Sequence, residues 1–195
     1  MTVSSTRCCR RSDLLGAILA LWLAAACAIG APAHAQGIDI KRPTVTIAED
    51  HFVLEAQFDI ALTPTLEEVL NKGVALYFLL EFELIRPRWY WLNERVINFH
   101  QEYRLSYNAL TRQYRLGVGN LHQNFASARE ALDVMSRVRR RVDVEPGTLR
   151  RDTAYNAALR FRLDTSQLPK PFQLNALIAR EWNVGSDWYR WTVGP

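Results

Sequence analysis

The stretch from Gly73 to Trp91, GVALYFLLEFELIRPRWYW, constrains the fold more than any other part of this chain. From Leu80 onward, apolar and acidic side chains alternate with a period of two, the pattern of a β-strand with one face in a core and the other in water. Pro87 lacks a backbone donor and restricts the residue before it to extended geometry, so we expect strand pairing to stop there. The sequence therefore predicts a central strand that ends in an aromatic and basic tip.

The first 35 residues have the pattern of an export signal. Three arginines precede an apolar run from Leu14 to Ala31, and Ala33-His34-Ala35 supplies a small-x-small cleavage site before Gln36. We therefore expect residues 1–35 to be a cleavable signal peptide and residues 36–195 to be a single β-rich periplasmic domain. The alternative is an inner-membrane anchor, because an apolar run of about 18 residues can span a bilayer if it is not cleaved.

The cysteines and the charge exclude several classes of function. All three cysteines, Cys8, Cys9 and Cys27, lie in the expected signal, so the mature form has no thiol nucleophile, thiolate metal site or disulfide. The net charge of +4 for the whole chain is too small to indicate nucleic-acid binding, and export argues against it as well. We expect no nucleic-acid partner.

Enzyme motifs are absent from the sequence. No serine lies in a G-x-S-x-G turn, no H-E-x-x-H pair occurs, and neither a phosphate loop nor a dinucleotide-binding glycine pattern is present. Active sites are assembled in space, so this absence lowers the expectation of catalysis without removing it. We predict a protein that is not an enzyme and that binds no cofactor or metal.

Alternating patterns recur along the mature chain and predict seven or eight amphipathic strands, with one further brief strand. The predicted strands are Ile38 to Ile47, Phe52 to Ile60, the central strand, Arg95 to Tyr107, Arg112 to Val118, a brief one at Val142 and Val144, Tyr155 to Leu163, Ala179 to Val184 and Asp187 to Val193. The first two form a hairpin in which Pro43 marks an edge strand, and the central strand begins a three-stranded meander.

Two segments carry the residues that typically begin and end a helix. Thr63-Pro64 supplies an N-cap followed by proline at the first helical position, and Gly73 lies just past the end. Ser127-Ala128-Arg129-Glu130 is a capping box that predicts a second helix from Ser127 to about Val138. Four arginines, Arg137, Arg139, Arg140 and Arg141, are then expected at its C-terminal end, where the helix dipole favours cations. Residues 172–178 are a further possible helical turn.

These elements predict a mainly β fold. We expect an antiparallel β-sandwich, immunoglobulin-like in its general architecture, with two short α-helices in the connections. The alternative is a single curved sheet with both helices packed on one face.

One face of the predicted sheet gathers ionisable groups. His100 and Glu102 share a strand face, and Glu81 and Glu83 are placed to face them from the neighbouring strand. Such a cluster would suit a metal or acid-base site, in an envelope hydrolase or a carbohydrate-active protein. The alternative is a solvated sheet face on which Arg104 is the cross-strand partner.

The tip of the central strand is the leading candidate for partner binding. Its residues Arg86, Arg88, Trp89, Tyr90 and Trp91 belong to the types that dominate binding energy at protein interfaces. Aromatic and arginine side chains also anchor proteins at lipid headgroups or stack on sugar rings. The alternative is that the tryptophans fold back to close the end of the sandwich.

Three separated motifs resemble one known family. They are GVALYFLLEFELIRPRWYWLNERV at residues 73–96, YRLSYNALT at 103–111 and REWNVGSDWYRW at 180–191. Together with the signal peptide, they resemble the DUF4390 family of exported, uncharacterised proteobacterial proteins. The resemblance covers essentially the whole mature chain. It implies a small periplasmic domain and an envelope partner such as the outer portion of a sensor kinase, and it carries no catalytic residues.

Three hypotheses of function follow. The first is a non-enzymatic periplasmic module that binds a protein partner in the cell envelope through the tip. The second is the hydrolase or carbohydrate-active protein on the Glu81 face. The third is a structural protein that touches the membrane surface through the tip and the arginines at the C-terminal end of the second predicted helix.

Overall fold

Period-two alternation organises most of this protein into strands. The structure, a computed structural model, describes residues 37–87, 94–150 and 152–194, and these belong to one compact unit, Ala35–Pro195. The described strands are β1 (Ile38–Ile47), β2 (His51–Ile60), β3 (Leu76–Arg86), β4 (Glu94–Asn108), β5 (Gln113–Val118), β6 (Leu121–Phe125), β7 (Arg137–Asp143), β8 (Tyr155–Leu163) and β9 (Tyr189–Val193).

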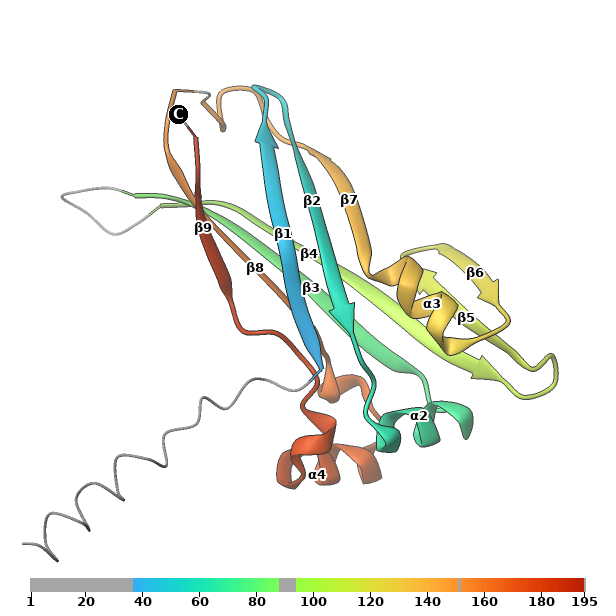
Figure 1. Ribbon diagram of the computed structural model, residues 1–195. Coiled ribbons are helices and arrows are strands. Elements are labelled where there is room, and N and C mark those ends of the chain that lie inside the picture. Colours follow the sequence, from blue (N-terminus) through green and yellow to red (C-terminus); the bar gives the residue numbers. More distant parts are fainter. Residues whose placement is uncertain (1–36, 88–93, 151, 195) are drawn as a thin grey trace, which may run out of the picture. The chain divides into compact units, whose positions relative to one another are not determined.

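The strands form two antiparallel sheets. The small sheet has the order β1-β2-β7 and the large sheet has the order β6-β5-β4-β3-β8-β9. The small sheet lies across one face of the large one (Figure 1), and apolar side chains fill the space between them. The predicted mainly β, sandwich-like fold is therefore confirmed, and the single-sheet alternative is wrong.

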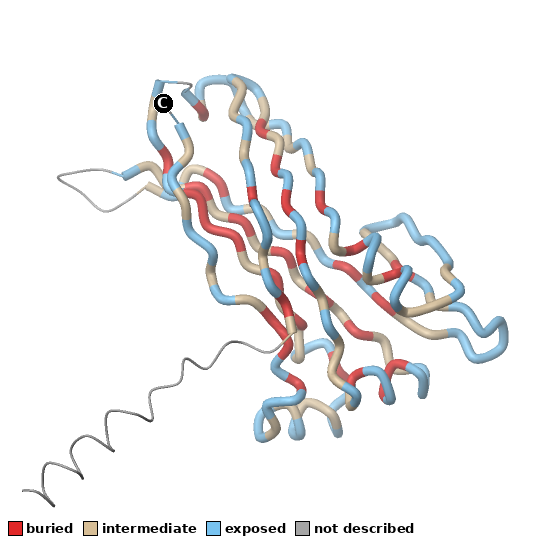
Figure 2. Tube along the Cα trace, in the orientation of Figure 1, coloured by how far each residue is buried: buried red, intermediate tan, exposed pale blue. Residues whose placement is uncertain are grey.

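The central strand predicted from the sequence is β3, which pairs with β4 on one side and β8 on the other. Its inward side chains are fully buried and alternate with half-buried ones along the whole strand, as the colouring of Figure 2 shows. The five buried residues are Leu76, Phe78, Leu80, Phe82 and Leu84. The strand ends at Arg86, directly before Pro87, because proline cannot donate to the ladder.

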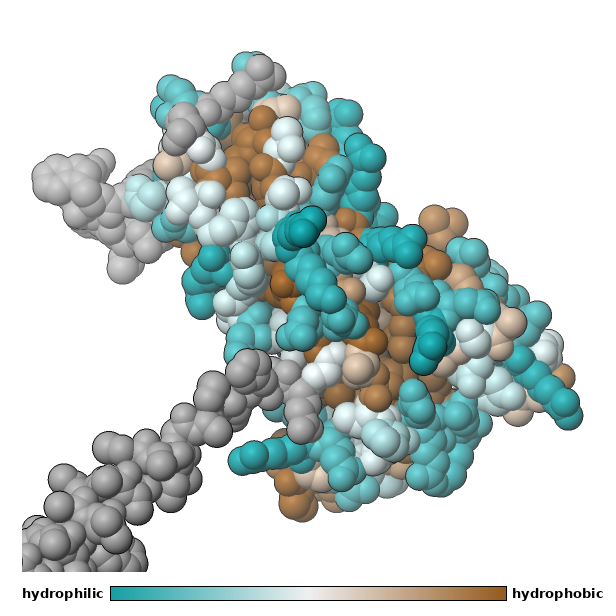
Figure 3. Space-filling model, viewed as in Figure 1, coloured by the Kyte–Doolittle hydropathy of each residue, from teal (hydrophilic) through white to brown (hydrophobic). Residues whose placement is uncertain are grey.

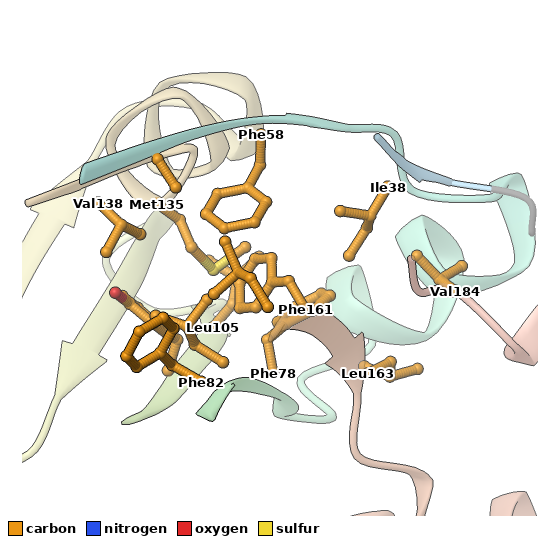
Figure 4. Packing of buried hydrophobic residues seen from close by; sticks show 14 of the residues in the cluster. Ile38, Phe58, Phe78, Phe82, Leu105, Met135, Val138, Phe161, Leu163 and Val184 are labelled. Atoms are coloured by element: carbon orange, nitrogen blue, oxygen red, sulfur yellow. The ribbon is translucent and has the colours of Figure 1, made fainter. Parts of the chain in front are cut away.

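Aromatic rings connect the two sheets in the core. Phe58 of the small sheet packs on Phe161 of the large sheet, with ring centroids 4.9 Å apart. Phe161 also contacts Phe78 at 5.9 Å and the edge of the Tyr103 ring at 5.6 Å. Figure 4 shows Phe58, Phe78 and Phe161 pointing toward one another, with Met135 and Val138 beside them. Every residue that is fully buried in the described ranges is apolar, aromatic or glycine.

Three α-helices occur in the described connections, one more than predicted. Helix α2 (Pro64–Asn71) begins at the expected N-cap Thr63, and α3 (Ala128–Met135) begins at the expected N-cap Ser127. The possible helical turn near the C-terminus is a full helix, α4 (Lys170–Ile178). Two short 3-10 helices, η1 (Thr165–Gln167) and η2 (Arg180–Trp182), flank it.

The arginine-rich segment is not the end of a helix. Helix α3 stops at Met135, and Arg137, Arg139, Arg140 and Arg141 lie on strand β7, which pairs with β2 over its whole length. In this strand, Val138 pairs with Ala56 of β2 and is buried in the core.

One further strand prediction was wrong, and one strand was missed. Residues 179–184 are not a strand, because the chain turns through η2 and packs Trp182 against Phe172 of α4, with ring centroids 5.6 Å apart. Strand β6 was not predicted at all. Four of its five residues are exposed, so the segment has no apolar alternation that could reveal it.

Candidate functional site

A single arginine holds the base of the predicted tip. Arg86, the last residue of β3, donates from Nη1 to Glu94 Oε2 at 3.1 Å, and Glu94 is the first residue of β4. Its Nη2 donates to the backbone oxygen of Thr148 at 3.1 Å and to the hydroxyl of Tyr155 at 3.5 Å. The guanidinium carbon also lies 5.7 Å from the centroid of the Tyr155 ring. We call this network the Arg86 clamp.

The clamp joins four segments that are far apart in the sequence. It connects the end of β3, the start of β4, the connection before β8 and the first residue of β8 itself. Tyr155 is fully buried, and its hydroxyl also accepts a hydrogen bond from the backbone of Arg150 at 2.9 Å. The hydrogen bond to the Tyr155 hydroxyl raises the pKa of the Arg86 guanidinium above its ordinary value, burial partly offsets that rise, and Glu94 adds a smaller one.

The predicted binding residues of the tip have different outcomes. Arg86 is engaged in the clamp, and its side chain is 23% exposed. Arg88, Trp89, Tyr90 and Trp91 lie outside the described residues. A role of the tip in partner binding therefore stays a prediction. The structure adds that the two strands flanking the tip, β3 and β4, are joined by the hydrogen bond between Arg86 and Glu94.

The predicted acidic face lies on the outer side of the large sheet. Glu81 stands directly opposite His100 on β4, in the same cross-strand row, and opposite Arg160 on β8. Glu83 and Glu102 are one row away, in opposite directions along the sheet, because they pair with Asn98 and Leu79 respectively. The structure thus brings Glu81 and His100 together, as expected. Glu83 and Glu102 lie on either side of that pair and not beside each other.

The ion pairs of Glu81 come from β8 and not from β4. Arg160 contacts Glu81 Oε2 at 2.7 Å from Nη2 and at 2.8 Å from Nε, and Arg162 Nε contacts the same oxygen at 3.1 Å. The predicted partner Arg104 instead lies over the ring of Tyr77, 5.7 Å from its centroid. Sequence reasoning could not see this, because it paired β3 only with β4.

The remaining acids of this face have partners of their own. Glu83 pairs with Arg95 at 3.5 Å, and Glu102 accepts a hydrogen bond from Gln167 at 2.9 Å. In the described ranges, no three His, Cys, Asp or Glu side chains are arranged to hold a metal ion. Glu81 and Glu83 thus form ion pairs with arginines of neighbouring strands.

The same outer face carries a polar hollow of about 620 Å³. It lies where β3, β4 and β5 meet the β5–β6 turn and η1. The side chains that line it are almost all polar or charged, and they include Tyr77, Glu102, Arg104, Ser106, Arg115, His122 and Gln167. The sequence of β6 shows no apolar alternation, so the position of His122 in the lining of this hollow could not be predicted.

No helix among the described residues is long and apolar enough to cross a membrane. Comparison with protein families finds one match, a family described as a domain of unknown function (DUF4390), over residues 35–192. No curated protein and no solved structure matches the chain. The matched range includes β1 to β8 in full and most of β9, so it covers both the Arg86 clamp and the outer face of the large sheet.

Proposed function

This chain belongs to the DUF4390 family, and from that premise we propose that it is a non-enzymatic binding module of the cell envelope. In this proposal, the protein docks a protein partner through the tip, residues 86–91. The Arg86 clamp is the observation that carries the proposal, because it ties the strands on both sides of the tip to the body of the domain.

Clamping the base has a direct energetic benefit for binding. A segment whose ends are already fixed loses less conformational entropy when it meets a partner, so more of the contact energy contributes to affinity. The tip sequence supplies two tryptophans, a tyrosine and an arginine beyond the clamp, and these residue types form most binding hot spots.

The cellular setting of the proposal rests on the sequence. Residues 1–35 have the pattern of an export signal, so we place the domain in the periplasm, with an inner-membrane anchor as the alternative if the signal is not cleaved. The partner we propose is an envelope protein, such as the outer portion of a sensor kinase.

The two other hypotheses have less support. A hydrolase on the Glu81 face would need a carboxylate that is free to exchange protons with a substrate, whereas Glu81 contacts two guanidiniums. The third hypothesis placed its arginines at a helix end, and that placement is wrong because they lie on β7.

The test is a crosslinking capture of the mature protein from envelope extracts. The test variant is Trp89→Ala with Tyr90→Ala, and the matched control is Leu110→Ala, whose side chain is 96% exposed in the turn between β4 and β5. We expect one membrane protein to be captured by the wild type and the control but not by the double variant. In a direct binding assay, that purified protein should bind the wild type and the control with similar affinity and the double variant more weakly.

Two results would refute the proposal. One is equal capture by the wild type and the double variant, which would assign the tip a purely structural role. The other is a double variant that loses capture only because it unfolds, as shown by a lowered urea midpoint.

A further inference from the structure

The outer face of the small sheet carries a second hollow, of about 440 Å³, whose lining includes three arginines and a single carboxylate. Its charged lining consists of Arg42 from β1, Glu55 from β2, and Arg137 and Arg139 from β7, with Thr44 and Gln57 beside them. Figure 3 shows strongly hydrophilic side chains gathered over the middle of these three strands. We call this hollow the arginine hollow.

Strand register explains why these residues meet. Gln57 pairs with Arg137 and Glu55 pairs with Arg139, so both arginines project from the same face of the sheet as their partners on β2. Thr44 stands opposite Glu55 on the other side of β2. The two edge strands therefore place their polar side chains on either side of the central strand.

The third arginine reaches the hollow through an irregularity in β1. The register shifts between Lys41 and Thr44, which leaves Arg42 and Pro43 as a bulge. Arg42 has φ 47°, a left-handed conformation that is unfavourable for a residue with a side chain, and Pro43 is buried beside it. Backbone strain at a residue other than glycine is concentrated at binding sites, where the strain positions a functional group.

The charges around the hollow do not balance. Glu55 is the one carboxylate in its lining, and it pairs with Arg139 at 3.0 Å. Arg42 and Arg137 form no ion pair with any described residue. Two other acids on this sheet are already paired, Asp59 with Lys41 at 2.7 Å and Asp143 with Arg141 at 3.1 Å. Two guanidiniums are therefore left without a counter-ion.

We propose that the arginine hollow binds a phosphate group. Guanidinium forks match phosphate oxygens with paired hydrogen bonds, and a doubly charged phosphate would neutralise the two unpaired cations. Thr44 and Gln57 supply neutral donors at the rim. The volume exceeds what a bare phosphate needs, so the ligand is a phosphate ester, either a soluble metabolite or the headgroup of an anionic phospholipid.

The test measures binding of two probes to the mature form expected from the sequence, residues 36–195. Glycerol 3-phosphate is the soluble probe, followed by calorimetry at low salt. Vesicles of phosphatidylcholine with and without phosphatidylglycerol are the lipid probe, followed by co-sedimentation. Binding to the soluble probe alone identifies a metabolite site, and binding to the phosphatidylglycerol vesicles alone identifies a headgroup site.

The variants separate the hollow from general positive charge. Arg42→Gln with Arg137→Gln removes the two unpaired cations, and we expect it to weaken binding by about tenfold or more. Arg141→Gln removes a cation from the same strand, outside the hollow and already paired with Asp143, and should change affinity less than about twofold.

A third variant tests the strain at the bulge. Asparagine tolerates the left-handed conformation, so Arg42→Asn should preserve or raise the thermal midpoint while it weakens phosphate binding. The proposal is overturned if the wild type binds neither probe, if Arg42→Gln with Arg137→Gln binds as tightly as the wild type, or if Arg141→Gln weakens binding as much as that double variant.

Discussion

The guanidinium of Arg160 lies against the carboxylate of Glu81 across the β3–β8 pair, with 2.7 Å between Nη2 and Oε2. The same guanidinium stacks on the ring of Trp188, 4.6 Å from its centroid. One arginine thus links the central strand to the segment that leads into β9. The Glu81 side chain is 21% exposed and the Arg160 side chain 29% exposed, so solvent screens this pair less than a surface pair.

Glu81→Gln is expected to destabilise the fold. The substitution removes the charge that two arginines share, and we expect the free energy of unfolding to fall by about 1–2 kcal/mol. Glu83→Gln is the matched control on the same strand face, where the ion pair with Arg95 is longer, at 3.5 Å, and the change should stay below about 0.5 kcal/mol. Urea denaturation measures both, and equal losses would contradict the assigned role of Glu81.

Phe161→Ala tests the aromatic contact between the two sheets. Phe161 is fully buried and contacts Phe58, Phe78 and Tyr103, so its loss leaves a cavity at the centre of the core. We expect the free energy of unfolding to fall by about 3–5 kcal/mol. Leu110→Ala, at an exposed turn, should change it by less than about 0.5 kcal/mol. A small effect of Phe161→Ala in urea denaturation would mean that the sheets are not held together at this point.

Tyr103 is expected to make the stability of the fold depend on pH in the alkaline range. Burial raises the pKa of its hydroxyl, and Arg140 offsets part of that rise. The folded state therefore holds the proton more tightly than the unfolded state, so this contribution to stability is complete below pH about 10 and is lost as the pH rises through the folded pKa.

Tyr103→Phe should consequently flatten the loss of stability above pH about 10, since phenylalanine cannot ionise. The measurement is the urea midpoint of both proteins at a series of pH values from neutral to strongly alkaline. Tyr189→Phe, at a ring that is 44% exposed, is the control and should keep the steep alkaline loss of the wild type. Parallel pH profiles for wild type and Tyr103→Phe would refute the prediction.

The two helix caps should differ in strength. The Thr63 side chain accepts from Leu66 N at 3.3 Å and donates to the backbone oxygen of Glu181 at 2.9 Å, whereas Ser127 caps only its own helix, accepting from Glu130 N at 3.2 Å. Thr63→Ala should therefore cost about 1–2 kcal/mol and Ser127→Ala about 0.5–1 kcal/mol. Thermal denaturation would contradict this if Ser127→Ala were the more harmful change.

Local patterns in the sequence were sufficient for most of the strands. The alternation from Leu80 to Leu84 requires one face to be buried, and Pro87 ends the ladder through its own covalent structure. The same local logic identified both capped helices, because Thr63 and Ser127 satisfy backbone donors within their own turn. These features depend only on neighbouring residues.

Partners across the sheets were decided by tertiary structure. Arg137 to Arg141 fit a helix end as well as a strand, and only pairing with β2 selected the strand. Likewise, Glu81 received its arginines from β8, which lies about 80 residues further along the chain and gives no local sign of which strand it will join. The sequence by itself determined which residues of β3 face inward and where that strand ends. The tertiary structure alone decided which charges meet, since long-range pairing depends on the whole core and not on local periodicity.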